Sequence, residues 1–377
     1  MRIALGIHRL TPRGGLEDHA IRIGEELERR GHAVTLFSTN TAPALTLPVQ
    51  LIQAPGRSNH ARMAGFGASL TRATANSFDR VVGFQPLPGL DVLFLADHLR
   101  DRPGLRFWKR LLPRHRTYAR LERACFGEGS RTRIMGLARP QMRAFAERYP
   151  ESLDRTVVLP PSITESKRRP QLRRPELRDA TRRRLQIGDS TPVWLWLGLQ
   201  PRIKGLDRAI DALALVPEAV LLVGGIAESD ERAAALVRQA ARLGVAGRIR
   251  WLGYLSGDAL FSTFAASDAL AHPSRVDVTA AVILEALVNG LPVVATAECG
   301  FADHIEESGA GRVVPTPFVT ASFAHMLQEV CGPANVAMSS KGIDHGRNPA
   351  LYSGISAACD LIEAEVWPRE LTLGGGM

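Results

Sequence analysis

The sequence predicts an α/β protein with two domains, each built on a doubly wound parallel sheet. Three observations lead to this prediction. Short apolar runs typical of buried strands alternate with longer amphipathic runs typical of helices. This alternation stops near residue 160 and starts again near residue 190. The chain has 377 residues, of which 45% are hydrophobic and 23% charged, so it is long and apolar enough for two ordinary cores.

The N-terminal half, residues 1–160, is predicted to begin with a strand, a glycine-containing loop, a helix and a second strand. Apolar runs over 2–7 and 32–37 indicate the strands, and apolar residues at helical spacing indicate a helix over about 16–30. A unit of this kind predicts parallel strands. The other elements predicted in this half are strands near 49–53, 80–84, 91–95 and 156–159, and helices over 106–126 and 138–148.

The C-terminal half, residues 190–350, repeats the pattern. Its predicted elements are strands over 193–197, 219–223, 249–252, 269–271 and 292–296, and helices over 204–215, 228–243, 258–266 and 279–289. Residues 161–189 are basic and interrupted by prolines, which predicts an interdomain linker running into a helix at about 175–185. A last helix near 353–366, within residues 351–377, is expected to pack back on the N-terminal domain. Ligands of such proteins bind at the carboxyl ends of the strands, so we expect the site in an interdomain cleft.

Cysteine usage and hydropathy bear on the compartment. The four cysteines are widely scattered and include no C-x-x-C pair, which excludes a disulfide framework or a zinc ribbon and fits a reducing compartment. The first apolar run is too short for a signal peptide, and no run of about 18 apolar residues exists to cross a membrane. We therefore expect a cytoplasmic protein that at most lies on a membrane surface.

The net charge of +9 comes from two short segments. Residues 102–126 hold eight Lys or Arg against one Glu, and residues 165–185 hold nine against three acids. In the first segment apolar residues recur near helical spacing and include Trp and Tyr, with Pro113 expected to break or kink the helix. A basic amphipathic helix of this composition is attracted to an anionic lipid surface. The residues expected to contact the membrane are Trp108, Lys109, Arg110, Arg114 and Arg116.

Other interpretations of both segments stay open. The first is also consistent with an ordinary surface helix whose apolar stripe belongs to the core. The second is equally consistent with a solvated charged face. Nucleic-acid binding is the weakest interpretation, because no nucleic-acid motif or set of stacking aromatics accompanies the charge, so no nucleic-acid partner is expected.

The most specific motif contains two acids eight residues apart. Asp277 stands in a predicted strand-to-helix loop, and Glu285 follows within the helix. Thr279, Ala280 and Ala281 form the first turn of that predicted helix, whose free backbone N–H groups can hold a diphosphate. One acid can then bind sugar hydroxyls and the other ribose hydroxyls. The alternative for Asp277 is a helix cap.

This motif, followed by the Glu-Ala…Gly-Leu-Pro-Val-Val-Ala run, resembles the donor-site signature of family 4 retaining glycosyltransferases. The resemblance implies the GT-B fold, in which two Rossmann-like domains face each other across a cleft. Arg202 and Lys204-Gly205 look like that family's Arg/Lys-Gly segment, whose cations neutralise the diphosphate as it leaves. Gly14-Gly15 resembles its N-terminal loop, where small residues let donor and acceptor approach the backbone.

Further segments are similar to the lipopolysaccharide core glucosyltransferase I family over nearly the whole chain. They are Gly14-Gly-Leu16, Pro88-Gly-Leu-Asp-Val92, Ala96-Asp97, Tyr118-Ala119, Glu122-Arg-Ala124, Leu159-Pro-Pro161, Lys204-Gly205, His272-Pro273, Cys299-Gly300 and Leu351-Tyr-Ser353. The resemblance implies transfer of glucose from UDP-glucose to a core heptose on the cytoplasmic face of the inner membrane. It implies a cleft role for Asp97-His98 and Asp277 as catalytic residues, and an acceptor-side role for Asp18-His19.

The sequence also departs from the family. Asp277 stands where the family usually has Glu, Lys167 stands near a family Arg, Leu199 replaces a common Arg, and the glycine common after the first acid is Ala or Thr here. No residues have metal-ligand spacing and no isolated Asp-x-Asp motif occurs, so we expect no metal and no other cofactor.

The expected function is thus a metal-independent hexosyltransferase that takes a UDP-sugar and a lipopolysaccharide core or related glycolipid. One alternative is a GT-B sugar-nucleotide epimerase, which would need acids and histidines acting on the sugar ring. Another is a transferase-like, membrane-associated binding protein that has lost turnover.

Overall fold

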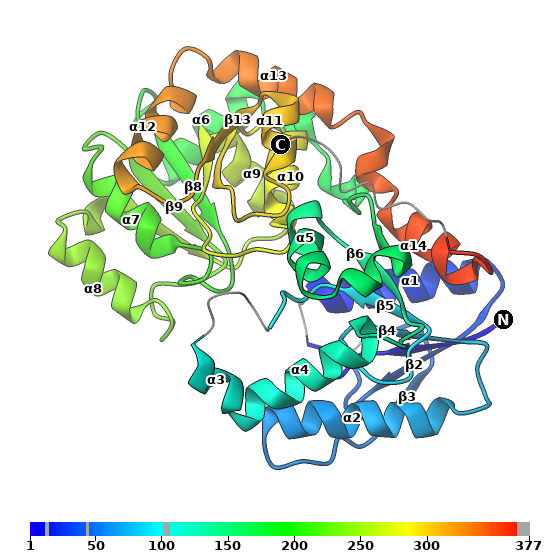
Figure 1. Cartoon of the computed structure of the whole chain (residues 1–377). Coiled ribbons are helices and arrows are strands. Elements are labelled where there is room, and N and C mark those ends of the chain that lie inside the picture. The colour runs from blue at the N-terminus through cyan, green and yellow to red at the C-terminus, as the bar shows by residue number, and fades with distance from the viewer. Residues whose placement is uncertain (12–14, 43–44, 101–105, 368–377) are drawn as a thin grey trace. The chain divides into compact units, whose positions relative to one another are not determined.

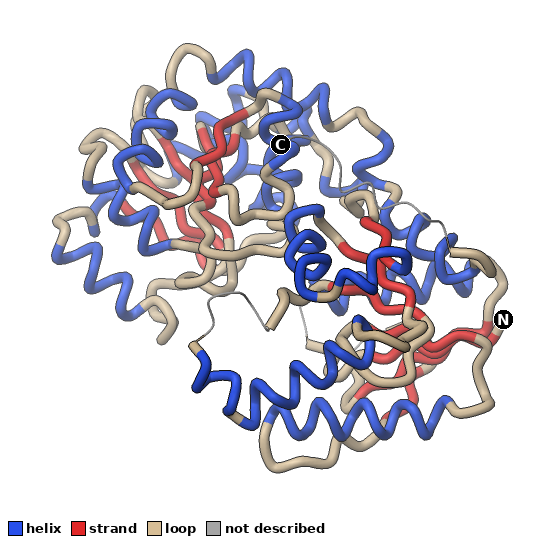
Figure 2. Tube along the Cα trace, viewed as in Figure 1, coloured by secondary structure: helices blue, strands red, loops and turns tan. Residues whose placement is uncertain are grey.

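The computed structural model describes residues 1–11, 15–42, 45–100 and 106–367. The chain forms two compact units, coloured along the sequence in Figure 1. Unit 1 comprises Met1–Ser162 and Tyr352–Met377, and unit 2 comprises Ile163–Leu351. In each unit the strands lie together and helices surround them (Figure 2).

Unit 1 is a Rossmann-like domain. Its strands are β1 (Arg2–Gly6), β2 (Ala33–Ser38), β3 (Val49–Leu51), β4 (Arg80–Gly83), β5 (Val92–Leu95), β6 (Arg133–Gly136) and β7 (Thr156–Val158). Its helices are α1 (Gly15–Arg29), α2 (Asn59–Thr74), α3 (Phe107–Leu111), α4 (Pro113–Phe126), α5 (Arg139–Arg148) and α14 (Gly354–Glu363), with a short 3-10 helix, η1 (Pro150–Arg155). The described strands form a seven-stranded parallel sheet in the order β3-β2-β1-β4-β5-β6-β7.

Strand β1 illustrates why this sheet forms. Ile3, Ala4 and Leu5 are all fully buried. Ile3 and Leu5 join one apolar cluster and Ala4 joins another, because successive side chains of a strand point to opposite faces. A central strand covered by helices on both faces is therefore apolar throughout, which is the run that the sequence displays.

Helix α14 packs against α1 within unit 1. The Arg30 guanidinium links the two helices, because its Nη1 lies 2.6 Å from Asp360 Oδ1 and 2.9 Å from Glu363 Oε2. His32 Nε2 adds a contact of 2.7 Å to Glu363 Oε1. The last described helix of the chain thus belongs to the N-terminal core.

Unit 2 is a second Rossmann-like domain. Its strands are β8 (Val193–Leu197), β9 (Val220–Gly224), β10 (Ile249–Gly253), β11 (Ala269–His272), β12 (Val293–Thr296) and β13 (Gly311–Val314). Its helices are α6 (Pro175–Arg184), α7 (Leu206–Ala214), α8 (Ala234–Arg242), α9 (Gly257–Ala266), α10 (Ala281–Val288), α11 (Asp303–Ser308), α12 (Thr320–Cys331) and α13 (Asn335–His345). The 3-10 helices are η2 (Glu165–Lys167), η3 (Pro170–Leu172), η4 (Ala246–Arg248) and, at the unit boundary, η5 (Pro349–Tyr352). The described strands form a six-stranded parallel sheet in the order β10-β9-β8-β11-β12-β13.

The sequence patterns did not predict every element. Strands β6 and β13 are four residues long and each contains an arginine, so neither is long enough to show a clear period. Helix α2 was missed, and it contains glycines that are poor helix formers. A Cβ atom added at Gly65 would lie 2.1 Å from the Pro55 carbonyl oxygen, so this glycine permits close packing of α2 on a neighbouring loop. Helices α11, α12 and α13 were also not predicted.

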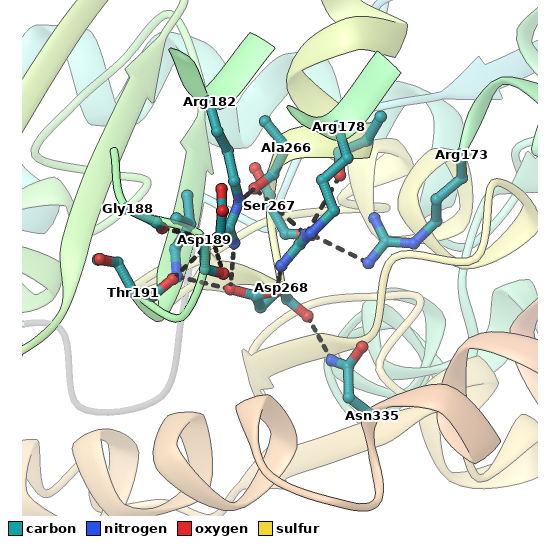
Figure 3. A network of polar contacts seen from close by, with 12 residues as sticks. Arg173, Arg178, Arg182, Gly188, Asp189, Thr191, Ala266, Ser267, Asp268 and Asn335 are labelled. Atoms are coloured by element: carbon teal, nitrogen blue, oxygen red, sulfur yellow. Dashed lines mark hydrogen bonds and ion pairs between the residues drawn. The ribbon is translucent and has the colours of Figure 1, made fainter. Parts of the chain in front are cut away.

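The linker predicted over 161–189 is wrong, because residues from Ile163 onward are packed into unit 2. Helix α6 lies against α9, and Arg182 on α6 is fully buried. Its guanidinium donates to Asp268 Oδ2 at 2.8 Å and to the carbonyl oxygens of Gly188, Asp189, Thr191 and Ala266 (Figure 3). Arg182 is therefore part of the core of unit 2, whereas Arg183 and Arg184 on the same helix are exposed.

Two neighbouring arginines complete this network. Arg178 Nη2 lies 2.6 Å from Asp268 Oδ1, and Arg173 donates to the carbonyl oxygens of Phe264 and Ser267. These carbonyls stand at the C-terminal end of α9, where unsatisfied oxygens and the helix dipole attract cations.

The first basic segment forms two helices instead of one over 106–126. Pro113 is the first residue of α4, a position where its missing N–H costs nothing. Helix α4 buries Leu121, Cys125 and Phe126, so its apolar stripe belongs to the core. Helix α3 buries no residue.

Candidate functional site

The loops that follow β8, β9 and β11 meet at the carboxyl edge of the unit 2 sheet. Gly205 has a left-handed backbone, with φ of 72°, and precedes α7. A Cβ atom there would lie 1.9 Å from the carbonyl oxygen of Pro273, in the loop after β11. Only glycine allows this contact, which explains physically why Lys204 is followed by Gly205.

Lys204 and Asp277 form an ion pair across these loops. The Asp277 side chain is 10% exposed, and its Oδ2 also lies 3.2 Å from Nε2 of the buried His272. Burial alone would raise the pKa of Asp277, but the hydrogen bond from His272 and the charge of Lys204 outweigh it and hold that pKa well below its usual value. The site thus holds an ionised carboxylate beside a partly exposed ammonium group.

Backbone and hydroxyl contacts fix this pair in place. The indole N–H of Trp196 donates to the Lys204 carbonyl oxygen at 2.9 Å. Ser274 Oγ donates to the Ile203 carbonyl oxygen at 3.1 Å, which ties the loop after β11 to the loop after β8. The N–H of Gly300 donates to the Asp277 carbonyl oxygen at 3.0 Å. Both charged residues therefore stand on loops held by several elements.

The helix that carries Glu285 begins later than predicted. The expected first turn at Thr279, Ala280 and Ala281 is wrong, because α10 starts at Ala281 and Ala280 has a left-handed backbone with φ of 56°. An alanine in this conformation is strained, and a glycine would adopt it freely. The first turn of α10 contains no acid, so its free N–H groups keep their positive character.

Glu285 is paired with a residue outside the two-acid motif. Lys167 Nζ lies 2.6 Å from Glu285 Oε1. Asn289 donates to the carbonyl oxygens of Lys167 and Glu285, both at 2.7 Å, so it fixes the segment before α6 on α10. Arg202, the other predicted phosphate ligand, has an exposed side chain and forms no ion pair with any described residue.

The residues predicted for the acceptor side lie in unit 1. His19 Nδ1 lies 2.6 Å from the Gly15 carbonyl oxygen, and Nε2 lies 2.7 Å from Ser162 Oγ, so both ring nitrogens have partners within this unit. Asp18 is exposed and lies 3.4 Å from Arg22. A Cβ atom added at Gly15 would meet nothing within 4 Å, and the predicted Gly14 lies outside the described residues.

Asp97 and His98 follow β5. Asp97 lines a cavity of about 220 Å³ together with Arg100, Tyr118 and Glu122. Burial raises the pKa of Asp97, and the Arg100 guanidinium, 3.7 Å away, partly offsets this effect. A carboxyl group with a raised pKa in a cavity is a candidate for proton transfer or for binding a hydroxyl.

Within the part of the chain that the structure describes, three side chains could together hold a metal ion. They are His304, Glu307 and His345, whose ligand atoms lie within 4.8 Å of one another. They belong to α11 and the end of α13, and not to the loops that carry Lys204 and Asp277. Sequence spacing missed this group because 41 residues separate the two histidines.

The comparisons with known proteins agree with this fold. Residues 178–331 match the family model described as "Glycosyl transferases group 1". The chain is 32% identical to the lipopolysaccharide glucosyltransferase WaaG of Escherichia coli (strain K12), over 96% of this chain and 98% of that protein. It is 26% identical to a D-inositol 3-phosphate glycosyltransferase of Nocardia farcinica, over 85% of this chain and 77% of that protein.

Solved structures give the same result. The crystal structure of WaaG aligns with a TM-score of 0.83 and 29% identity, covering 96% of this chain and 99% of that one. The crystal structure of Anabaena HepE in complex with UDP aligns with a TM-score of 0.73 and 19% identity, covering 96% of this chain and 98% of that one. The protein is thus a glycosyltransferase with the GT-B fold. It belongs to the same glycosyltransferase family as WaaG.

Sequence reasoning missed several residues of the site. His272 was noted only as part of a segment similar to the family, although it lies beside Asp277 in space. Lys167 was noted as a family difference, and nothing in its spacing indicated a contact with Glu285, 118 residues away. Trp196, within the strand predicted over 193–197, is buried, but its N–H also positions Lys204.

Proposed function

We propose that this protein is a retaining, metal-independent hexosyltransferase that uses the UDP-sugar UDP-glucose as its donor. Its acceptor is a heptose of the lipopolysaccharide core or of a related membrane glycolipid. The observation that supports this best is the Lys204–Asp277 pair beside the acid-free N-terminus of α10. This arrangement offers positive groups to a diphosphate and a carboxylate to sugar hydroxyls.

Each residue of the donor site has a distinct task in this proposal. The Lys204 ammonium group and the N–H groups of α10 neutralise the diphosphate, on which charge develops as the glycosidic carbon departs. Asp277 stays ionised and accepts hydrogen bonds from the hexose. Glu285 has two carboxylate oxygens, so Oε1 can keep its contact with Lys167 while Oε2 accepts from ribose. The leaving phosphate takes the proton of the attacking acceptor hydroxyl.

The acceptor is expected to use the cavity beside Asp97. The raised pKa of Asp97 and its position after a strand of unit 1 suit a group that orients an acceptor hydroxyl. The relative that supports this acceptor class is WaaG, a lipopolysaccharide glucosyltransferase.

The exposed residues of α3 support binding to an anionic membrane surface. Phe107 is 78% exposed, Trp108 45% and Leu111 68%, and Lys109 and Arg110 stand between them. Exposed aromatics beside cations suit the boundary between headgroups and acyl chains. Among the described residues, no helix is both long and apolar enough to cross a bilayer. The protein is therefore proposed to bind the inner face of the cytoplasmic membrane peripherally.

The test is calorimetric titration with UDP, UDP-glucose, UDP-GlcNAc, UDP-galactose and GDP-mannose, with EDTA and then with added Mg²⁺. We expect UDP and UDP-glucose to bind equally well in both buffers. Lys204→Ala should weaken UDP binding roughly 10–100-fold, since a hydrogen bond to a charged group contributes about 1.5–3 kcal/mol. Glu285→Ala should weaken it by a similar factor.

Arg238→Ala, an exposed change on α8, is the control for the loss of one cation in unit 2. Thermal melts of all variants are needed to establish that the chain stays folded, because Lys204→Ala leaves the Asp277 carboxylate with the His272 ring as its remaining described side-chain partner. Undiminished UDP affinity in both Lys204→Ala and Glu285→Ala would refute the donor site. Tight UDP binding without glucose transfer to any glycolipid would support a lapsed transferase instead, a fate consistent with the strained Ala280.

A further inference from the structure

A second cavity, of about 670 Å³, lies at the carboxyl edge of the unit 1 sheet. It is formed by the loops after β1, β2 and β3 and by the start of α2. Its described lining residues are His8, Arg9, Thr39, Asn40, Leu51, Ile52, Gln53, Ala54, Pro55, Asn59 and Arg62. Ligands of parallel α/β sheets bind at this edge. None of these residues belongs to the donor site or to the Asp97 cavity.

The described lining of this cavity has cations and no acid. Arg9 and Arg62 form no ion pair with any described Asp or Glu, and Arg62 Nε donates only to the Gly56 carbonyl oxygen, at 3.2 Å. His8, Arg9 and Arg62 line the same cavity, and burial together with the charges of the two arginines lowers the pKa of His8. Like charges gathered without a counter-charge favour an anion.

The start of α2 adds positive character. This helix has 16 residues, its N-cap Ser58 Oγ accepts from the Ala61 N–H at 3.3 Å, and its first turn contains no acid. Arg62 stands near this end, where a cation opposes the helix dipole and lowers helix stability. A bound anion would reverse this effect, because it would interact favourably with both the dipole and the guanidinium.

The polar groups around the cavity are held in position. Thr39 Oγ1 donates to the His8 carbonyl oxygen at 2.6 Å, and the His8 ring stands edge-on to Phe66 with centroids 5.4 Å apart. Asn40 bonds both the N–H and the carbonyl oxygen of Leu10, at 2.9 and 2.7 Å. The loop that carries His8 and Arg9 is thus held in position beside the cavity.

We infer that this cavity binds an anionic substituent of the acceptor glycan, a phosphate monoester or a sugar carboxylate. The inference rests on the proposed function, since it assigns the cavity to the acceptor of that reaction. Arg9 and Arg62 donate to the anion, and the substituent fixes which hydroxyl of the glycan reaches the Asp97 cavity. The cavity is thus a specificity site that takes no part in donor binding.

The first experiment measures transfer from UDP-glucose to three acceptors. They are a phosphorylated core glycolipid, the same glycolipid after phosphatase treatment, and the glycolipid with its sugar carboxylates reduced. The variants are Arg62→Gln and Arg9→Gln, with Arg72→Gln, an exposed change in the last turn of α2, as the control. We expect Arg62→Gln to raise the acceptor KM about tenfold or more, with kcat and UDP affinity unchanged.

If Arg62→Gln no longer raises the KM of one modified acceptor, the group removed from that acceptor, phosphate or carboxylate, is the bound anion. If Arg62→Gln and Arg9→Gln leave the KM of the intact acceptor unchanged, the inference is wrong. Equal increases in KM for all three acceptors would also overturn it, because the arginines would then act on the glycan as a whole.

A second measurement needs no turnover and so separates this inference from the proposed function. Inorganic phosphate is titrated into the full chain while NMR follows the ring resonances of His8. We expect a saturable shift that is lost in Arg62→Gln and kept in Arg72→Gln. A shift together with no UDP binding would refute the proposed function and support the anion site. UDP binding with no shift and no KM effect would support the donor site and refute the anion site.

Discussion

The two basic segments, 102–126 and 165–185, have nearly the same net charge and opposite structural fates. In the first, the described part forms α3 and α4, and every residue of α3 is exposed. In the second, α6 brings Arg182 to complete burial against α9. Net charge alone therefore does not tell whether a basic segment meets solvent, a membrane or the protein core.

The burial of Arg182 depends on the acceptors that it finds. Arg182 donates to Asp268 and to four carbonyl oxygens, so its N–H groups are paired and its charge is compensated in the interior. Most of these acceptors are carbonyl oxygens, which any sequence provides. Helix α3 instead presents Phe107 and Trp108 to its surroundings.

The largest expected effect is that of Arg182→Met. Removing one partner of a buried charged network leaves Asp268 undercompensated and takes the guanidinium donor away from four carbonyl oxygens, which costs about 3–5 kcal/mol. For a unit of this size we expect a fall of roughly 10 °C in the melting temperature. Differential scanning calorimetry of the full chain measures it.

Arg183→Met is the matched control, since Arg183 is the next residue on the same helix and is exposed. Its free energy of unfolding should stay within about 0.5 kcal/mol of that of the wild type, so its melting temperature should hardly change. Equal melting temperatures for the two variants would break the comparison, because the arginines of this segment would then be equivalent.

The next effect concerns membrane binding by the first segment. Neutralising Lys109, Arg110 and Arg116 together to Gln should weaken binding to vesicles containing anionic lipid roughly 100-fold, at about 1 kcal/mol for each cation. Stability should hardly change, because all three side chains are exposed. Vesicle sedimentation and a thermal melt measure the two quantities.

The control removes the same charge from unit 2 by changing Arg183, Arg184 and Arg238, all exposed, to Gln. This variant should bind vesicles like wild type. If both triple variants lose binding equally, net charge and not α3 is responsible, and the contrast between the segments would not extend to membranes.

The fold class could be predicted from sequence because it depends on local patterns. The alternation of apolar strands and amphipathic helices predicted two parallel sheets, and the Asp277–Glu285 spacing led to the donor-site loop. Features that depend on distant partners could not be predicted. Arg182 meets Asp268 across 86 residues, and Lys167 meets Glu285 across 118. The late start of α10 was also hidden, because Ala280 adopts a backbone that alanine rarely takes.

The cavity with His8, Arg9 and Arg62 shows the same limit. Its basic residues come from the loop after β1 and from α2, a helix that the sequence pattern did not predict. Neither charge counting nor motif spacing groups such residues, since only the parallel sheet brings the ends of β1, β2 and β3 to one edge.

The smallest effect on stability, and the sharpest test of the comparison, comes from salt. Raising NaCl from about 0.1 M to about 1 M shortens the Debye length from about 10 Å to about 3 Å, which screens exposed charges and hardly affects buried ones. Vesicle binding through α3 should therefore fall steeply, while the difference in melting temperature between wild type and Arg182→Met should stay nearly constant. A penalty for Arg182→Met that shrinks with salt would mean that solvent reaches the network, and salt-resistant vesicle binding would mean that Phe107 and Trp108 carry the attachment without the cations.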